Sequence, residues 1–120
     1  MHLTIHTDGG ARGNPGPAGI GVVIKNTAGE IVYAHGQYIG KTTNNQAEYQ
    51  ALVHAVKKAV ELGGTEIACF LDSELLVRQL NYQYRVKDAG LATLFMQVVN
   101  VAQGFKKITY KHIRREQNTA

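Results

Sequence analysis

The first forty residues alternate between apolar and polar positions with a period of two, which is typical of β-strands. Residues 2–8, 18–26 and 30–40 each follow this pattern, and a tight turn around residues 28–30 separates the last two segments. Antiparallel neighbours can be joined by such short connections. The pattern therefore predicts an antiparallel meander of three strands.

The period changes after residue 43. From Asn44 to Leu62 the apolar residues recur on one helical stripe, with a threonine before the stripe for capping and two glycines after it as a stop signal. Residues 66–72 then form a short run that is apolar at successive positions, as expected of a strand buried on both faces within a parallel sheet. We therefore predict a helix followed by a buried parallel strand.

The remaining segments complete an α/β pattern. Ser73 is suited to cap a short helix that ends near residue 81, apolar spacing indicates another helix over 91–102, and residues 106–114 read as the last strand. The predicted order is βββαβααβ. We expect one domain over residues 1–120, built on a mixed five-stranded sheet of three antiparallel strands followed by parallel strands, with helices packed on both faces.

Composition is that of an ordinary globular domain, with 44% hydrophobic and 18% charged residues in a chain of 120. The N-terminus has no signal-peptide pattern, and no apolar run approaches the roughly 18 residues that span a bilayer. We therefore expect a cytoplasmic protein without a membrane partner. Cys69 cannot form an internal disulfide and is expected to be a buried thiol. The net charge of +4 is only weak support for a phosphate-bearing partner.

Three acidic residues stand at positions that suggest a chemical role. Asp8 ends the first strand, Glu48 lies in the first turns of the long helix, and Asp72 ends the buried strand. If the first strand pairs beside the strand over 66–72, the two aspartates project from neighbouring strands, and the helix can bring Glu48 alongside. Converging carboxylates repel one another and need cations, and their oxygen donors suit Mg²⁺ or Mn²⁺.

Each acid also has a purely structural explanation. Asp8 before glycine is common in turns, Asp72 before Ser73 could cap a helix, and Glu48 could complement a helix dipole. Taken singly, these explanations are the stronger ones. The three acids together, in this strand order, favour a shared site.

The chain resembles the ribonuclease H type 1 family in three blocks. "TDGGARGNPGPAGIG", "TTNNQAEYQAL" and "DSELLVRQL" are similar to its signature motifs, and the resemblance runs over essentially the whole chain in order. The form is compact, because residues 89–105 carry no Lys or Arg and a Lys- and Trp-rich basic protrusion is missing. No glycine-rich phosphate loop or dinucleotide motif suggests an organic cofactor.

The resemblance implies an endonuclease that hydrolyses the RNA strand of RNA–DNA hybrids. Family members work with two divalent ions, Mg²⁺ or Mn²⁺, which Asp8, Glu48 and Asp72 would hold as catalytic and metal-binding residues. They recognise RNA by its 2′-hydroxyls in the minor groove, and one threonine helps to hold a DNA phosphate. The matching nucleic-acid-binding residues are Gly10, Ala11, Gly13, Asn14, Thr43, Asn44 and Asn45.

Alternatives to these assignments stay open. Asn14 before proline could be only a turn residue, and Asn44 and Asn45 could be only helix caps. The family also has a fourth acid on a final helix, and "NTA" at 118–120 resembles the start of the step that precedes it. We therefore expect the last helix to be missing from this sequence and activity to be weak. The alternative function is a weakened or inactive module that binds hybrids or double-stranded RNA. The sequence does not indicate the oligomeric state.

Overall fold

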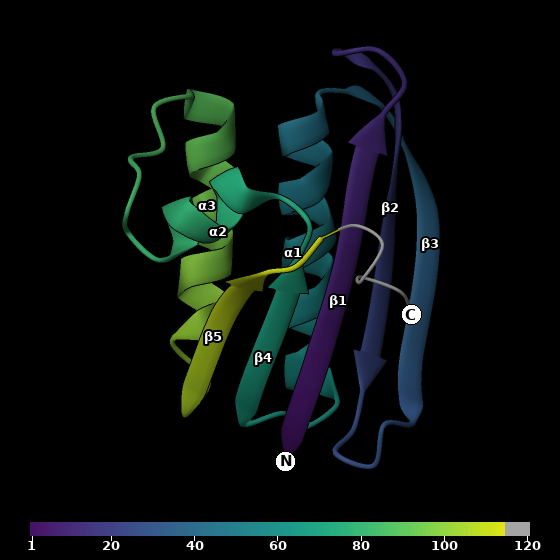
Figure 1. Cartoon of the computed structure of the whole chain (residues 1–120), viewed down its shortest axis with the longest axis vertical. Coiled ribbons are helices and arrows are strands. Elements are labelled where there is room, and N and C mark those ends of the chain that lie inside the picture. The colour runs from purple at the N-terminus through teal and green to yellow at the C-terminus, as the bar shows by residue number, and fades with distance from the viewer. Residues whose placement is uncertain (115–120) are drawn as a thin grey trace.

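The computed structural model of the chain describes residues 1–114 and forms one sheet with three packed helices (Figure 1). The alternating and helical patterns of the sequence are found where they were expected, with shifts of a few residues at the ends. The elements are β1 (His2–Ala11), β2 (Gly16–Lys25), β3 (Ile31–Thr42), α1 (Asn44–Glu61), β4 (Glu66–Leu71), α2 (Glu74–Leu80), α3 (Ala89–Ala102) and β5 (Lys107–His112).

The sheet has the strand order β3-β2-β1-β4-β5, so β1 lies at its centre. β1 pairs antiparallel with β2, and β2 with β3, whereas β1 pairs parallel with β4, and β4 with β5. The predicted mixed sheet of five strands is thus confirmed, including the pairing of the first strand with the fourth. One detail differs, because β1 continues to Ala11 and Asp8 lies inside the strand rather than at its end.

One face of the sheet carries the core. Leu3 and Ile5 of β1 are buried there together with alternate residues of β2 and β4, and α1, α2 and α3 supply the other side of the same cluster. Figure 1 shows α1 running behind the sheet. We expected helices on both faces. Within residues 1–114 the three helices cover one face only, and the opposite face, which we call the open face, is partly exposed.

β4 is less buried than its composition suggested. Ile67, Cys69 and Leu71 face the core and are at most 2% exposed, whereas the residues between them are only half-buried on the open face. There the ring of Phe70 stacks on His6 of β1, with centroids 5.2 Å apart. The expectation of a strand buried on both faces was therefore wrong, because no described helix covers the second face.

Local signals set the ends of the helices. The Thr43 hydroxyl accepts a hydrogen bond from the backbone N–H of Gln46 at 3.2 Å, and Ser73 caps α2 in the same way, as predicted. Gly63 follows α1 with φ of 83°, a conformation that ends helices and favours glycine. The last helix begins two residues earlier than expected, because the Asp88 side chain caps it by accepting from the N–H of Leu91. In residues 1–114 we find no helix with the length and apolar character needed to cross a membrane.

Candidate active site

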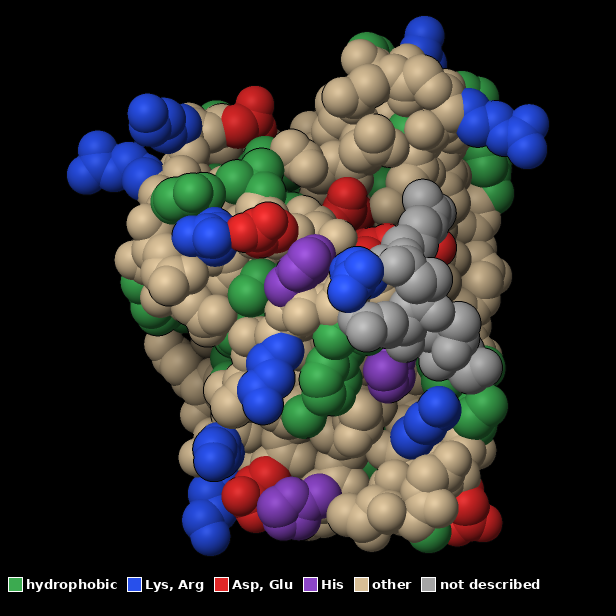
Figure 2. All heavy atoms as spheres, in the orientation of Figure 1, with side chains coloured by type: hydrophobic (Ala, Val, Ile, Leu, Met, Phe, Trp, Pro, Cys, Tyr) green, Lys and Arg blue, Asp and Glu red, His purple; other side chains and the backbone are tan. Residues whose placement is uncertain are grey.

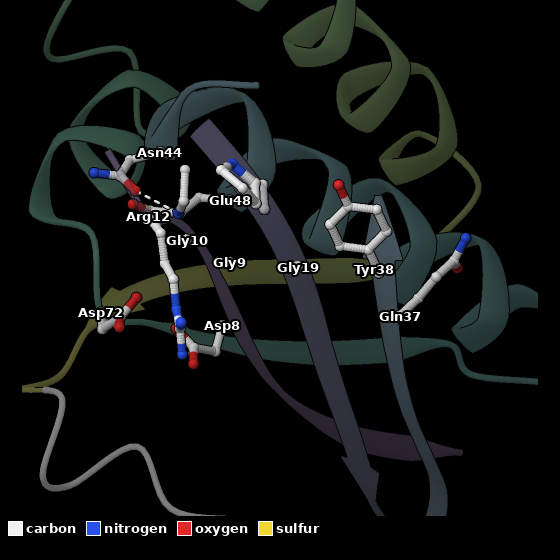
Figure 3. A pocket seen from close by; sticks show the side chains of 13 residues that line it. Asp8, Gly9, Gly10, Arg12, Gly19, Gln37, Tyr38, Asn44, Glu48 and Asp72 are labelled. Atoms are coloured by element: carbon white, nitrogen blue, oxygen red, sulfur yellow. Dashed lines mark hydrogen bonds between the residues drawn. The ribbon is translucent and has the colours of Figure 1, made fainter. Parts of the chain in front are cut away.

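A cleft of about 1020 Å³ opens at the end of the sheet where β1 and β4 have their carboxyl ends. Asp8, Glu48 and Asp72 all line it (Figure 3). The three acids that the sequence singled out are therefore brought to one place, although they lie 40 and 24 positions apart along the chain. In the space-filling view, acidic side chains lie in the upper part of the open face, and basic side chains lie beside and below them as well as at the edges (Figure 2).

The parallel pairing of β1 with β4 sets the position of the two aspartates. Thr7 of β1 is level with Leu71 of β4, so Asp8 and Asp72 are the next residues on neighbouring chain segments. Neighbouring strands lie about 4.8 Å apart, which places the two backbones close enough for the carboxylates to share a ligand. Asp8 is exposed and Asp72 half-buried, so both remain accessible from the cleft.

Gly9 brings the third acid to the same point. A β-carbon built on Gly9 would lie 2.5 Å from the carbonyl carbon of Ala47 and 2.6 Å from the backbone nitrogen of Glu48. Only glycine allows the first turns of α1 to pack this closely against β1. The glycine after Asp8 therefore has a structural role, which is to place the helix that carries Glu48 beside the strand that carries Asp8.

A buried hydrogen bond fixes α1 to α2 on the core side of the cleft. The Tyr49 hydroxyl, one residue after Glu48, donates to Oε1 of Gln79 at 2.6 Å, and both side chains are buried. Burial also raises the pKa of the Tyr49 hydroxyl, so it remains a donor. This bond ties the helix carrying Glu48 to the helix that begins after Asp72. The sequence analysis missed it, because Tyr49 looks like any apolar residue of the helical stripe.

The donor set fits a hard divalent cation. The three acids offer carboxylate oxygens, which are the ligands that Mg²⁺ and Mn²⁺ prefer. No three acidic, histidine or cysteine side chains within residues 1–114 are arranged as a ready-made metal site. Mg²⁺ does not need such a cluster, because it usually takes one or two protein carboxylates and completes its shell with water and substrate phosphates. The expected fourth acid would follow residues 118–120, which lie outside the described residues.

Asparagines lock the β1–β2 turn onto the start of α1. The backbone N–H of Ala11 donates to Oδ1 of Asn44 at 2.6 Å, and the N–H of Asn44 donates to Oδ1 of Asn14 at 3.1 Å. Both side-chain oxygens are used inside the protein, so the amide NH₂ groups are the parts that can turn to a ligand. Asn14 and Asn44 are therefore more than a turn residue and a helix cap, since they join two segments 30 positions apart.

The other predicted contact residues lie around the same cleft or next to it. Gly10 and Ala11 line the cleft, while Gly13 takes a positive φ of 82° within the turn. Thr43 uses its hydroxyl as the N-cap of α1, and Asn45 lies half-buried in the first turn of that helix. The cap found in the structure is thus Thr43 and not the asparagine pair.

Arg12 and Tyr38 are lining residues of the cleft that the sequence analysis did not single out. Arg12 is positively charged, whereas the other charged residues that line the cleft are acidic. Figure 3 shows the Arg12 side chain directed toward the region of Asp8 and Asp72. Tyr38 of β3 lines the opposite side, and its side chain is 70% exposed. The alternation of β3 could have placed Tyr38 on the open face, but the sequence gives no sign that β3 borders the cleft.

Known proteins resemble this chain over nearly its whole length. The model of the reverse transcriptase-like family matches residues 6–120. The bifunctional protein Rv2228c of Mycobacterium tuberculosis is 42% identical over 120 residues, covering 99% of this chain and 33% of that protein. Ribonuclease HI of Halobacterium salinarum is 38% identical over 111 residues, covering 92% of this chain and 56% of that protein. The chain thus spans about a third and about half of these relatives.

Solved structures agree with the sequence matches. The N-terminal RNase H domain of Rv2228c, solved as a fusion with maltose-binding protein, is 39% identical with a TM-score of 0.96, covering 98% of this chain and 91% of that one. LC11-RNase H1 in complex with an RNA/DNA hybrid is 42% identical with a TM-score of 0.92, covering 98% and 88% of the two chains. The mixed sheet and its packed helices are therefore those of the ribonuclease H fold.

Proposed function

The chain belongs to the reverse transcriptase-like family and has a ribonuclease H-like domain, and from this we propose that it hydrolyses the RNA strand of RNA–DNA hybrids. The observation that carries the proposal is that Asp8, Glu48 and Asp72 line one cleft. A similar protein, LC11-RNase H1, has been solved with an RNA/DNA hybrid, which supports the same substrate class here.

We further propose that the three carboxylates hold two divalent ions, Mg²⁺ or Mn²⁺. When bound, such ions orient the attacking water and neutralise the charge that develops on the phosphate and the departing 3′ oxygen. Asp8 of the central strand, Glu48 of α1 and Asp72 after β4 would hold the ions through their carboxylate oxygens.

The residues around the carboxylates select and position the hybrid in this proposal. Because Oδ1 of Asn14 and Oδ1 of Asn44 accept hydrogen bonds within the protein, we propose that their NH₂ groups donate to acceptors of the minor groove, which lie in the bases and in the ribose 2′-hydroxyl. Thr43 and Asn45 stand at the start of α1, where backbone N–H groups favour a phosphate. The bare backbone of Gly10 lets a strand approach the acids closely.

A labelled RNA strand tests the proposal. We expect the chain to shorten this RNA when it is annealed to DNA and Mg²⁺ or Mn²⁺ is present, and to leave it intact with a chelator. Single-stranded RNA, duplex RNA and duplex DNA serve as the comparison substrates. A mobility shift without shorter products under every ion condition would instead establish the binding module. Cleavage of duplex DNA at the rate of the hybrid would contradict the proposed substrate.

A further inference from the structure

The turn between β1 and β2 places a cation at the carboxylate cleft. Arg12, the first residue after β1, lines this cleft together with Asp8, Glu48 and Asp72, and its side chain is exposed. In Figure 3 the side chain extends from the turn toward the region of Asp8 and Asp72. Arg12 therefore brings positive charge to the place where the proposed ions and the phosphate of the hybrid would meet.

The fold fixes the backbone of Arg12 on several sides. Its N–H donates to the carbonyl oxygen of Pro17 at 2.8 Å, and the preceding N–H, that of Ala11, donates to Oδ1 of Asn44 at 2.6 Å. A β-carbon on Gly16 would lie only 1.7 Å from the carbonyl oxygen of Arg12, so the turn closes tightly against this residue. The point from which the guanidinium extends is thus set before a ligand arrives, which lowers the entropic cost of a contact.

The guanidinium of Arg12 has no such fixed partner within residues 1–114. Among these residues it takes part in no ion pair, although it lies in a cleft lined by acids. Arg78 shows the contrast, because its Nη2 lies 2.7 Å from Oε1 of Glu74 and its guanidinium lies 5.3 Å from the centroid of the Tyr84 ring. The fold thus holds the base of the Arg12 side chain firmly and leaves its charged end to a ligand.

We propose that Arg12 binds a phosphate of the RNA strand, at or next to the bond that is cleaved, through the N–H donors of its guanidinium. The inference rests on the proposed function and adds a substrate-binding residue to it. A guanidinium matches two phosphate oxygens at once, whereas a carboxylate repels a phosphate unless an ion lies between them. The RNA strand is the expected partner, because Arg12 extends toward the acids that are proposed to act on that strand.

The first test counts phosphate contacts by their dependence on salt. In the Asp8→Asn background, fluorescence anisotropy gives hybrid affinity between about 50 and 200 mM salt. Arg12→Gln should weaken binding about tenfold at the low end and reduce the slope of log affinity against log salt by about one, the value for one lost phosphate contact. Arg12→Lys should keep the slope, because it keeps the charge, and lose only part of the affinity. Lys107→Gln is the matched control, since it removes one charge from an exposed residue at the opposite end of the sheet and should keep the slope.

The second test locates the phosphate with a neutral linkage. Hybrids that carry one 2′-O-methyl methylphosphonate at successive positions of the RNA strand are compared with hybrids that carry a 2′-O-methyl phosphodiester at the same position. At one linkage the Asp8→Asn chain should lose about tenfold in affinity, and adding Arg12→Gln should cause little further loss, because both changes remove the same contact. That linkage should lie at or next to the one that the parent chain cleaves. Equal losses in both chains at every linkage of the RNA strand would overturn the contact.

The outcomes separate this inference from the proposed function. If the Asp8→Asn chain binds no hybrid at all, the proposed substrate is wrong and the inference falls with it. If that chain binds hybrid and Arg12→Gln changes neither the affinity nor the salt slope, only the inference is wrong. If Arg12→Gln lowers the free energy of unfolding in urea and leaves hybrid binding unchanged, Arg12 is a structural partner of the acids and the inference is overturned.

Discussion

The backbone nitrogen of Glu48 lies 2.6 Å from the place that a β-carbon would take at Gly9. This closeness joins a strand residue next to Asp8 to the helix that carries Glu48. Gly9→Ala should force α1 and β1 apart, since the clash is with backbone that cannot rotate away. We expect a loss of about 1–3 kcal/mol in the free energy of unfolding, measured with urea.

Cleavage of the hybrid should fall in the same Gly9→Ala variant, because Glu48 moves away from the aspartates. Gly10→Ala is the matched control for stability, since a β-carbon there would make only an ordinary contact, 3.9 Å from Oδ1 of Asn44. If Gly9→Ala were as stable and as active as the parent, this account of the glycine would be wrong.

Asp8→Asn should separate chemistry from binding. The amide has the size of the carboxylate but no charge, so the pull on divalent ions is weakened while the surface that meets the hybrid is kept. We expect cleavage to fall by about a hundredfold or more, with hybrid affinity changed only slightly. Single-turnover cleavage and anisotropy measure the two effects. A variant that cuts at the parent rate would show that Asp8 is not in the active site.

Asn44→Asp tests whether the side chain of Asn44 donates a hydrogen bond to the hybrid. A carboxylate can still accept the hydrogen bond from the N–H of Ala11, so the lock on the β1–β2 turn is kept. It cannot donate to the hybrid, and its charge repels phosphates. Hybrid binding should therefore fall by about tenfold while stability changes little. Asn44→Ala should lose both the lock and the contact, and equal binding by Asn44→Asp and the parent would exclude the donor role.

Tyr49→Phe tests the link between α1 and α2. The change removes the hydroxyl that donates to Gln79 at 2.6 Å and leaves a buried amide oxygen without its partner. We expect the free energy of unfolding to fall by about 1–3 kcal/mol in urea titrations. The double variant Tyr49→Phe with Gln79→Leu should recover part of this loss, because no polar partner is then left buried. No loss in the single variant would contradict a structural role for the bond.

His54 should make the stability of the domain depend on pH. Burial lowers the pKa of this imidazole, and nearby His35 and Lys58 lower it further. The Tyr33 hydroxyl lies 2.7 Å from Nε2 of His54, and the rings of His35 and His54 stack with centroids 4.4 Å apart. The unfolded chain therefore binds the proton more readily than the folded one. The resulting stability is present above pH ~6.5 and is lost as pH falls through that value toward the folded pKa.

Urea titrations between pH 7.5 and about 5 check this effect. We expect the free energy of unfolding to fall across this range, and the fall to be smaller in His54→Gln. An equal slope in His54→Gln and the parent would show that the His35–His54 pair does not control stability here.

The sequence predicted the secondary structure because local rules dominate it. Alternation marked the strands, the helical stripe after Thr43 marked α1, and Ser73 and the glycines after Leu62 marked helix ends, since capping and backbone freedom act within a few residues. The segment over 66–72 shows the limit of such patterns. Its apolar run suggested burial on two faces, but the cover on each face depends on elements far along the chain.

Asp8, Glu48 and Asp72 were recognisable as a candidate site from their motifs and from the expected strand order, and the structure places all three in one cleft. Their residue types and the resemblance to known signature blocks are properties of the chain itself. How the acids meet was not visible, because it depends on the register of β1 with β4 and on the contact of Gly9 with Glu48. Tyr38 is the clearest case of a residue that the motifs did not mark.

By itself, the sequence determined which segments become strands and helices and which carboxylates could act together. The tertiary structure alone decided that Oδ1 of Asn44 accepts a hydrogen bond from the N–H of Ala11 and that the Tyr49 hydroxyl donates to Gln79. It also decided that Tyr38 lines the cleft that holds the carboxylates. The physical reason is the distance along the chain over which each kind of interaction acts. Propensities and caps are set by neighbours within one turn or one hairpin, whereas these contacts join residues 30 or more positions apart and exist only after the sheet has fixed its register.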